Sequence, residues 1–148
     1  MQELSVKMGS WCMIAMGIFA LVTAVLWIFV TEVAFVSDFG AYTGQLYSDF
    51  LISNPKPAEL WLFTKRLIGI ERLATSLLIL FITQKSYRKG EKWSWYALLI
   101  AGVITWGSLI GYRVAIGYVE SVGIATPVLG LALLFIGLAL PARAILGK

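Results

Sequence analysis

Residues 60–84 read LWLFTKRLIGIERLATSLLILFITQ, an apolar run that contains four charged side chains, Lys65, Arg66, Glu71 and Arg72. About 20 predominantly apolar residues are needed to cross the hydrocarbon core of a bilayer as an α-helix. Three further runs of that length, residues 11–30, 93–112 and 122–140, carry no charge at all. The sequence therefore predicts an all-α membrane protein, with residues 1–148 forming one bundle of four transmembrane helices.

Composition agrees with a membrane protein. The chain has 148 residues, of which 59% are hydrophobic and only 14% are charged, whereas soluble domains carry about 25% charged residues. It contains no histidine and one cysteine, Cys12. This excludes histidine-ligated metal or haem sites, histidine general bases and paired redox thiols. The sequence predicts no cofactor and no metal site.

The charges outside the apolar runs predict the orientation. Residues 85–92 hold four basic side chains and one acidic, whereas residues 32–59 hold four acidic side chains and one basic. Basic connections stay on the cytoplasmic side. We therefore expect a multi-pass protein of the cell (plasma) membrane with both termini cytoplasmic. The first run is too long for a signal peptide and is expected to remain as a helix.

The long acidic connection has a pattern of its own. Its apolar residues recur at helical spacing, which predicts a single short amphipathic helix at the outer interface; these residues are Phe39, Tyr42, Leu46, Phe50 and Leu51. A solvated loop is the alternative. Because a proline disfavours helix at the preceding residue, this helix should end at Asn54, and the second span should begin at Pro57 or Ala58.

Tryptophans lie near the ends of the predicted spans. Trp11, Trp93 and Trp95 fall at inner boundaries, and Trp27 and Trp61 fall near outer ones. Such residues typically anchor helices at the membrane interface, so no functional role is predicted for them.

Two sets of glycines predict helix packing. In the fourth run they recur every seven residues, and in the third run they form a GxxxG pair; the residues are Gly123, Gly130, Gly137, Gly107 and Gly111. Small residues allow close approach of helices in lipid. Whether the neighbouring helix belongs to the same chain or to another is left open.

The charges of the second run are costly. A charged side chain at mid-membrane costs about 2.5–3.5 kcal/mol on insertion scales. Lys65 and Arg72 share a helix face, whereas Glu71 lies about 100° away and cannot pair directly with Arg72. Both Glu71 and Arg72 should therefore find partners on other helices.

The positions of these charges predict a polar cluster in the outer half of the bundle. It comprises Lys65, Arg66, Glu71, Arg72 and Arg113, with Glu32, Asp38 and Glu120 as candidate acidic partners. One interpretation is a set of salt bridges that fixes helix register. A second is a cavity that binds or transports an anionic or lipophilic small molecule. A third is a small membrane enzyme that uses Glu71 as acid or base.

The leading functional prediction is a non-catalytic membrane protein that either self-associates or is an accessory subunit of a larger membrane complex. Its expected partners are the lipid bilayer and further protein chains, and no nucleic acid is expected, because the positive charge is segregated by loop.

Residues 87–99, YRKGEKWSWYALL, together with Gly69-Ile70-Glu71 in the second run, resemble segments of small prokaryotic four-helix membrane proteins, including DoxX-like families. The resemblance implies a four-helix bundle. Some DoxX relatives are linked to quinol oxidase complexes, but no redox centre is evident in this sequence, and no catalytic residue is transferred.

Overall fold

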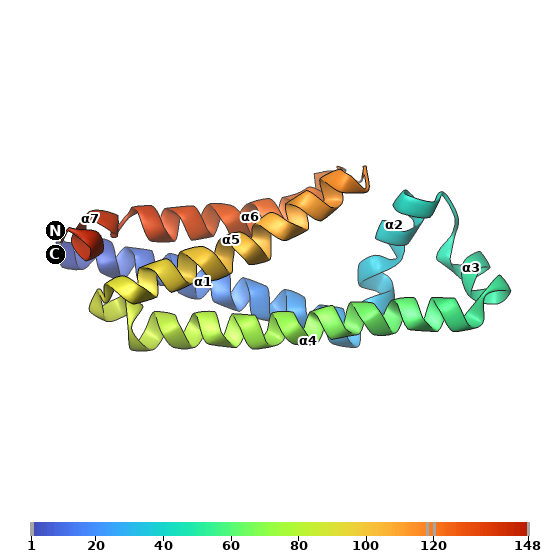
Figure 1. Cartoon of the computed structure of the whole chain (residues 1–148), viewed down its shortest axis with the longest axis horizontal. Coiled ribbons are helices and arrows are strands. Elements are labelled where there is room, and N and C mark those ends of the chain that lie inside the picture. Colours follow the sequence, from blue (N-terminus) through green and yellow to red (C-terminus); the bar gives the residue numbers. More distant parts are fainter. Residues whose placement is uncertain (1, 118, 120, 148) are drawn as a thin grey trace.

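The computed structural model describes residues 2–117, 119 and 121–147. This part of the chain is helical and contains no strand. Its long helices are α1 (Gln2–Phe29), α4 (Pro55–Lys85), α5 (Lys92–Ala115) and α6 (Ser121–Ala139), which run along a common direction (Figure 1). Three of them, α1, α4 and α5, are long and apolar enough to cross a membrane, and the searched part of α6 forms a shorter apolar helix, Ile124–Ala139. The all-α prediction is confirmed, with three candidate spans.

The helices pack around α1, which contacts both α4 and α6, while α5 contacts α6. Glycine permits a close approach of the α1 and α4 backbones. A Cβ atom added at Gly69 of α4 would lie 3.0 Å from Ile28 Cγ1 and 3.2 Å from the Ile28 backbone nitrogen. Because backbone cannot move aside as a side chain can, α4 lies directly against the end of α1 at this point.

Both termini lie at one end of the bundle (Figure 1), and hydrogen bonds between side chains and backbone carbonyls close this end. We call it the α7 end, after the short helix α7 (Ala142–Leu146). The Tyr87 hydroxyl, in the 3-10 turn η1 (Tyr87–Lys89), donates to the Gly137 carbonyl at 2.7 Å. Trp95 Nε1 donates to the Leu138 carbonyl at 3.0 Å. An apolar core lies beside them, formed by Met13, Met16, Ala20, Ile79, Leu98, Trp106, Leu134, Leu138 and Ile145.

The opposite end, which we call the α2 end, differs from the sequence prediction. The expected single amphipathic helix is wrong: the connection forms two helices, α2 (Thr31–Thr43) and α3 (Tyr47–Ser53). Gly44, with a φ of 70°, ends α2 in the left-handed conformation that glycine tolerates best. Both helices pack on α4, and the Tyr47 hydroxyl donates to the Ala58 carbonyl at 3.0 Å.

The start of α4 was also predicted wrongly. The helix begins at Pro55 rather than at Pro57 or Ala58, directly after Asn54 ends α3. Proline suits the first helical position because its missing N–H has no intrahelical partner there. From the α7 end towards the α2 end, α5 diverges from α4 (Figure 1), and large side chains bridge the two helices.

Candidate functional site

Arg72 of α4 is buried between two tryptophans. Its side chain is 6% exposed, and its guanidinium carbon lies 4.6 Å from the ring centre of Trp27 and 4.4 Å from that of Trp106. Arg72 Nε donates to Thr23 Oγ1 at 3.1 Å. A cation over a desolvated aromatic face gains up to about 2 kcal/mol. The two indoles from α1 and α5 thus replace part of the hydration that Arg72 has lost.

This arrangement leaves hydrogen-bond donors unused. Arg72 Nη2 and Trp106 Nε1 are both buried without a hydrogen-bond partner in the part of the chain that the structure describes. Arg72 also makes no ion pair with an acidic side chain among the described residues. An unsatisfied buried donor costs about 1–3 kcal/mol, and more when it is charged. The site lacks an acceptor.

Lys65 lies two turns from Arg72, on the same face of α4 and closer to the α2 end. Its side chain is buried, and Nζ lies 5.0 Å from the ring centre of Phe35, 5.4 Å from that of Trp61 and 5.2 Å from that of Tyr112. Three aromatic rings from α2, α4 and α5 therefore surround one ammonium group.

An ion pair links α2 to α5 beside these cations. Arg113 Nη1 lies 3.5 Å from Asp38 Oδ1, and both side chains are largely buried. Burial raises the pKa of Asp38 above its ordinary value, while the positive charges of Arg113 and Lys65 act in the opposite direction. The carboxylate offsets only part of the positive charge in this region.

Two cavities adjoin this group of side chains. One, of about 250 Å³, lies among α2, α4 and α5 and is lined by Trp27, Phe35, Asp38, Lys65, Ile68, Ser108, Leu109, Tyr112 and Arg113. The other, of about 240 Å³, extends to α6 and is lined by Thr23, Leu26, Trp27, Ala34, Ser37, Asp38, Leu109, Arg113, Thr126 and Pro127. Thr23 and Trp27, which contact Arg72, line the second cavity, whereas Arg72 and Trp106 themselves are among the lining residues of neither cavity.

Two of the five predicted cluster residues, Lys65 and Arg113, line one cavity together with Asp38, a candidate acidic partner. Arg72 lies two turns from Lys65 on the same face of α4 and contacts Trp27, which also lines that cavity. Arg66 is exposed on another face of α4, where its Nε donates to Thr31 Oγ1 at 3.2 Å.

Glu71 is exposed and lines neither cavity. The prediction that Glu71 and Arg72 point to different faces is confirmed. Of the other candidate acids, Glu32 is exposed, and Glu120 lies outside the described residues.

The predicted packing glycines divide into two groups. A Cβ atom at Gly130 would lie 2.3 Å from the Trp106 ring, and one at Gly137 would lie 3.0 Å from Met13 Sδ. These two glycines therefore pack within the chain, and Gly130 makes room for the tryptophan that covers Arg72. A Cβ at Gly111 would meet nothing within 4 Å, and one at Gly107 only Val103 of its own helix. The surroundings of Gly123 lie outside the description.

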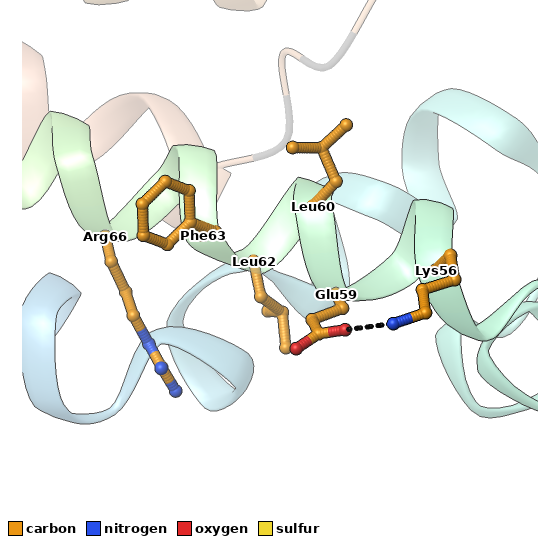
Figure 2. A pocket seen from close by; sticks show the side chains of 6 residues that line it. All are labelled: Lys56, Glu59, Leu60, Leu62, Phe63 and Arg66. Atoms are coloured by element: carbon orange, nitrogen blue, oxygen red, sulfur yellow. Dashed lines mark ion pairs between the residues drawn. The ribbon is translucent and has the colours of Figure 1, made fainter.

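A larger hollow of about 410 Å³ lies on the exposed flank of α4 (Figure 2). All of its lining residues, Lys56, Glu59, Leu60, Leu62, Phe63 and Arg66, belong to that one helix. Lys56 Nζ and Glu59 Oε2 are 4.0 Å apart on highly exposed side chains, a geometry that contributes at most about 1 kcal/mol. No second helix of the described chain contributes to the lining of this hollow, so we do not take it as the site.

Sequence reasoning missed the aromatic residues. Trp27 and Trp61 were predicted to be interfacial anchors, yet they contact Arg72 and Lys65. The spacing of Trp61 and Lys65, four residues apart on one helix, is a signal that could have indicated the second contact. The contact of Arg72 with Trp106 joins α4 to α5 and has no local signal.

Comparison of the chain with protein-family models, with curated proteins and with solved structures gives no match. The resemblance to DoxX-like proteins therefore stays a prediction, and the function has to be argued from the site.

Proposed function

We propose that this chain is an integral protein of the cell membrane with four spans and cytoplasmic termini, and that it binds an anionic amphiphile at the α2 end of the bundle. The ligand would carry a phosphate, sulfate or carboxylate head and an apolar tail. The head would occupy the cavities beside Arg72 and Arg113.

The observation that carries the proposal is the missing acceptor. Arg72 Nη2 and Trp106 Nε1 are neighbouring buried donors without partners among the described residues. Buried polar groups in native proteins are nearly always paired, and an exception calls for an explanation. In the proposed complex, an anionic oxygen that enters from the second cavity past Thr23 and Trp27 accepts from both donors.

The charge balance of the site favours an anion. Lys65, Arg72 and Arg113 are positive and Asp38 is negative, which leaves an excess of two positive charges. In a low-dielectric interior such an excess is expensive unless a counter-charge binds. Apart from Ser108, the remaining side chains that line the cavity among α2, α4 and α5 are apolar or aromatic, which favours a ligand with an apolar part.

The position of the site along α4 favours a ligand taken from the membrane. Arg72 lies 13 residues from Lys85, or about 20 Å along the helix, within a hydrocarbon thickness of about 30 Å. Ile68 and Tyr112, which line the cavity among α2, α4 and α5, are each partly exposed on the outside of the bundle. A tail could leave the cavity between these residues and enter the lipid.

The test is a binding titration on the purified chain in dodecyl maltoside, followed by tryptophan fluorescence, because two tryptophans flank Arg72. The probes are octyl phosphate and octanoate, compared with octanol and octyltrimethylammonium. We expect the two anions to saturate the signal, and the neutral and cationic probes to give no saturable change. Arg72→Met should weaken anion binding at least tenfold, since a hydrogen bond to a charged group contributes about 1.5–3 kcal/mol.

Arg66→Gln is the matched control, since it removes an exposed arginine from another face of the same helix. It should change the affinity less than twofold. Equal affinities for the anionic and neutral probes, or an Arg72→Met variant that binds as the wild type does, would refute the proposal.

A further inference from the structure

Arg88 and Trp11 form an exposed contact at the α7 end of the bundle. The guanidinium carbon of Arg88, in the turn η1, lies 6.0 Å from the ring centre of Trp11 on α1. Both side chains are exposed, as is Lys7, which lies four residues before Trp11 and therefore on the same face of α1. Neither Arg88 nor Lys7 forms an ion pair with an acidic side chain in the described part of the chain. Two cations and one aromatic ring are thus presented together on this surface.

The fold holds Arg88 in this position. The neighbouring side chain, Tyr87, is fully buried, and its hydroxyl donates to a carbonyl of α6. The Gly90 backbone nitrogen donates to the Tyr87 carbonyl at 2.9 Å and closes the turn around Arg88. Gly90 itself has a φ of 74°, which glycine tolerates best. Because the turn is already ordered, little conformational entropy is lost when a ligand binds to Arg88.

The membrane placement proposed above puts this surface at the depth of the lipid headgroups. Trp11 begins the apolar run 11–30, and Lys7 lies four residues outside it, or about 6 Å along the helix. The headgroup region adds about 5–7 Å to the hydrocarbon core on each side. The two cations on the Trp11 face are therefore expected at the level of the lipid phosphates.

The charge of the α7 end favours a lipid with a net negative headgroup. Among the described residues, the two terminal segments and the 85–92 connection carry six basic side chains against two acidic ones, Glu3 and Glu91. The Glu91 carboxylate already accepts from Trp93 Nε1 at 2.6 Å. Glu3 lies a further turn outside Lys7, away from the apolar run. A zwitterionic lipid would add its own cation to this positive surface, whereas an anionic lipid balances it.

We infer that Lys7, Trp11 and Arg88 form a binding site for the phosphate of one anionic phospholipid in the leaflet at the α7 end. The guanidinium donates to the phosphate oxygens while its face stays on the indole ring, a combination that arginine allows and lysine does not. Lys7 supplies a second cation from α1. The inference rests on the membrane placement of the proposed function and is independent of the anion site beside Arg72.

Native mass spectrometry of the purified chain in dodecyl maltoside tests the site. The probes are dioleoylphosphatidylglycerol, dioleoylphosphatidylcholine and glycerol phosphate, each added to the wild type and to Arg72→Met, in which the proposed anion site is removed. In both proteins one phosphatidylglycerol should bind at least tenfold more tightly than phosphatidylcholine, and glycerol phosphate should not be retained. Arg88→Gln should weaken phosphatidylglycerol binding at least tenfold, because charge-assisted hydrogen bonds are lost. Lys7→Gln, on a different helix, should weaken it at least threefold.

Lys89→Gln is the matched control, since it removes an exposed basic side chain from the same turn. At physiological ionic strength, which screens exposed charges beyond about 8 Å, it should weaken binding less than threefold. Equal losses in Arg88→Gln and Lys89→Gln would show only a general attraction to a positive surface and would overturn the inference. Equal affinities for the two phospholipids, or a loss of phosphatidylglycerol caused by Arg72→Met alone, would overturn it as well. So would an Arg88→Gln variant that unfolds at a lower temperature but binds phosphatidylglycerol as the wild type does, because the contact with Trp11 would then serve packing alone.

Discussion

At the scale of single residues, the main feature to explain is the free-energy cost of burying the charge of Arg72. A guanidinium buried between Trp27 and Trp106 has lost its hydration and, within the described part of the chain, has gained a single hydrogen bond, from Nε to Thr23. Replacement of buried charges by well-packed apolar residues is often neutral or stabilising by about 1–4 kcal/mol. A residue that costs stability in the free protein is expected to contribute to something other than folding.

Arg72→Met should therefore have opposite effects on stability and on binding. The flexible methionine keeps the contact with both indoles but removes the unpaired charge, so the thermal unfolding temperature of the ligand-free protein in detergent should be unchanged or higher. Anion binding should be lost in the same variant. A sharp fall in unfolding temperature would instead show that Arg72 serves to fix the packing of the helices.

A second prediction concerns Asp38 and pH. Burial raises the pKa of Asp38, and the charges acting on it are Arg113 of α5 and Lys65 of α4. As the pH falls through this raised pKa, Asp38 takes up a proton and the excess positive charge of the site increases by one. Affinity for octyl sulfate, which stays ionised throughout, should rise by about tenfold.

Asp38→Asn should remove this pH dependence and bind tightly at neutral pH, whereas Asp49→Asn, in an exposed part of α3, should behave as the wild type does. The raised pKa of Asp38 also determines in which direction pH changes the stability of the protein. The folded protein holds the Asp38 proton more tightly than the unfolded chain does, so the contribution of Asp38 to stability is greatest at low pH and is lost as the pH rises through the raised pKa. An affinity for octyl sulfate that does not change with pH would contradict this role of Asp38.

At the scale of the helices, the contact between α1 and α4 sets the position of Trp27. A Cβ at Gly69 would lie 3.1 Å from Trp27 Cβ as well as close to the Ile28 backbone. Gly69→Ala should therefore push the two helices apart and destabilise the protein by about 1–3 kcal/mol, as overpacking does. Anion binding should weaken with it.

Gly111→Ala is the matched substitution on α5, where an added Cβ meets nothing within 4 Å. There the better helix propensity of alanine should stabilise the protein by up to about 1 kcal/mol. Thermal unfolding of the two variants under one detergent condition measures the difference. A Gly69→Ala variant as stable as Gly111→Ala would mean that the contact at Gly69 does not position α1.

The helices themselves were largely predictable because apolar length is a local property of the sequence. The break at Gly44 was not predicted, because the spacing of Phe39, Tyr42 and Phe50 fits one continuous helix as well as two. Helical geometry correctly separated Glu71 from Arg72. It could not show that Trp106 would cover Arg72, because that contact depends on how α4 and α5 cross.

At the scale of the whole molecule, the two ends of the bundle differ in how their polar groups are paired. At the α7 end the Tyr87 hydroxyl and the Trp95 indole donate to carbonyls of α6. Towards the α2 end, Arg72 and Trp106 have donors without a partner among the described residues, next to Thr23 and Trp27 of the cavity walls. The interior of the first end is built for packing, and that of the second is suited to receive a ligand. Composition alone does not distinguish the ends, since both are rich in aromatic residues.

The most direct test of anion binding follows the six tryptophan indole N–H groups by ¹⁵N NMR during a titration with octyl phosphate, with Trp106 assigned through Trp106→Phe. The Trp106 signal should move downfield and saturate, because its Nε1 gains an acceptor. The Trp93 signal should stay in place, because Trp93 Nε1 already donates to Glu91 Oε2 at 2.6 Å. A Trp106 signal that does not respond at saturating octyl phosphate would contradict the proposed site.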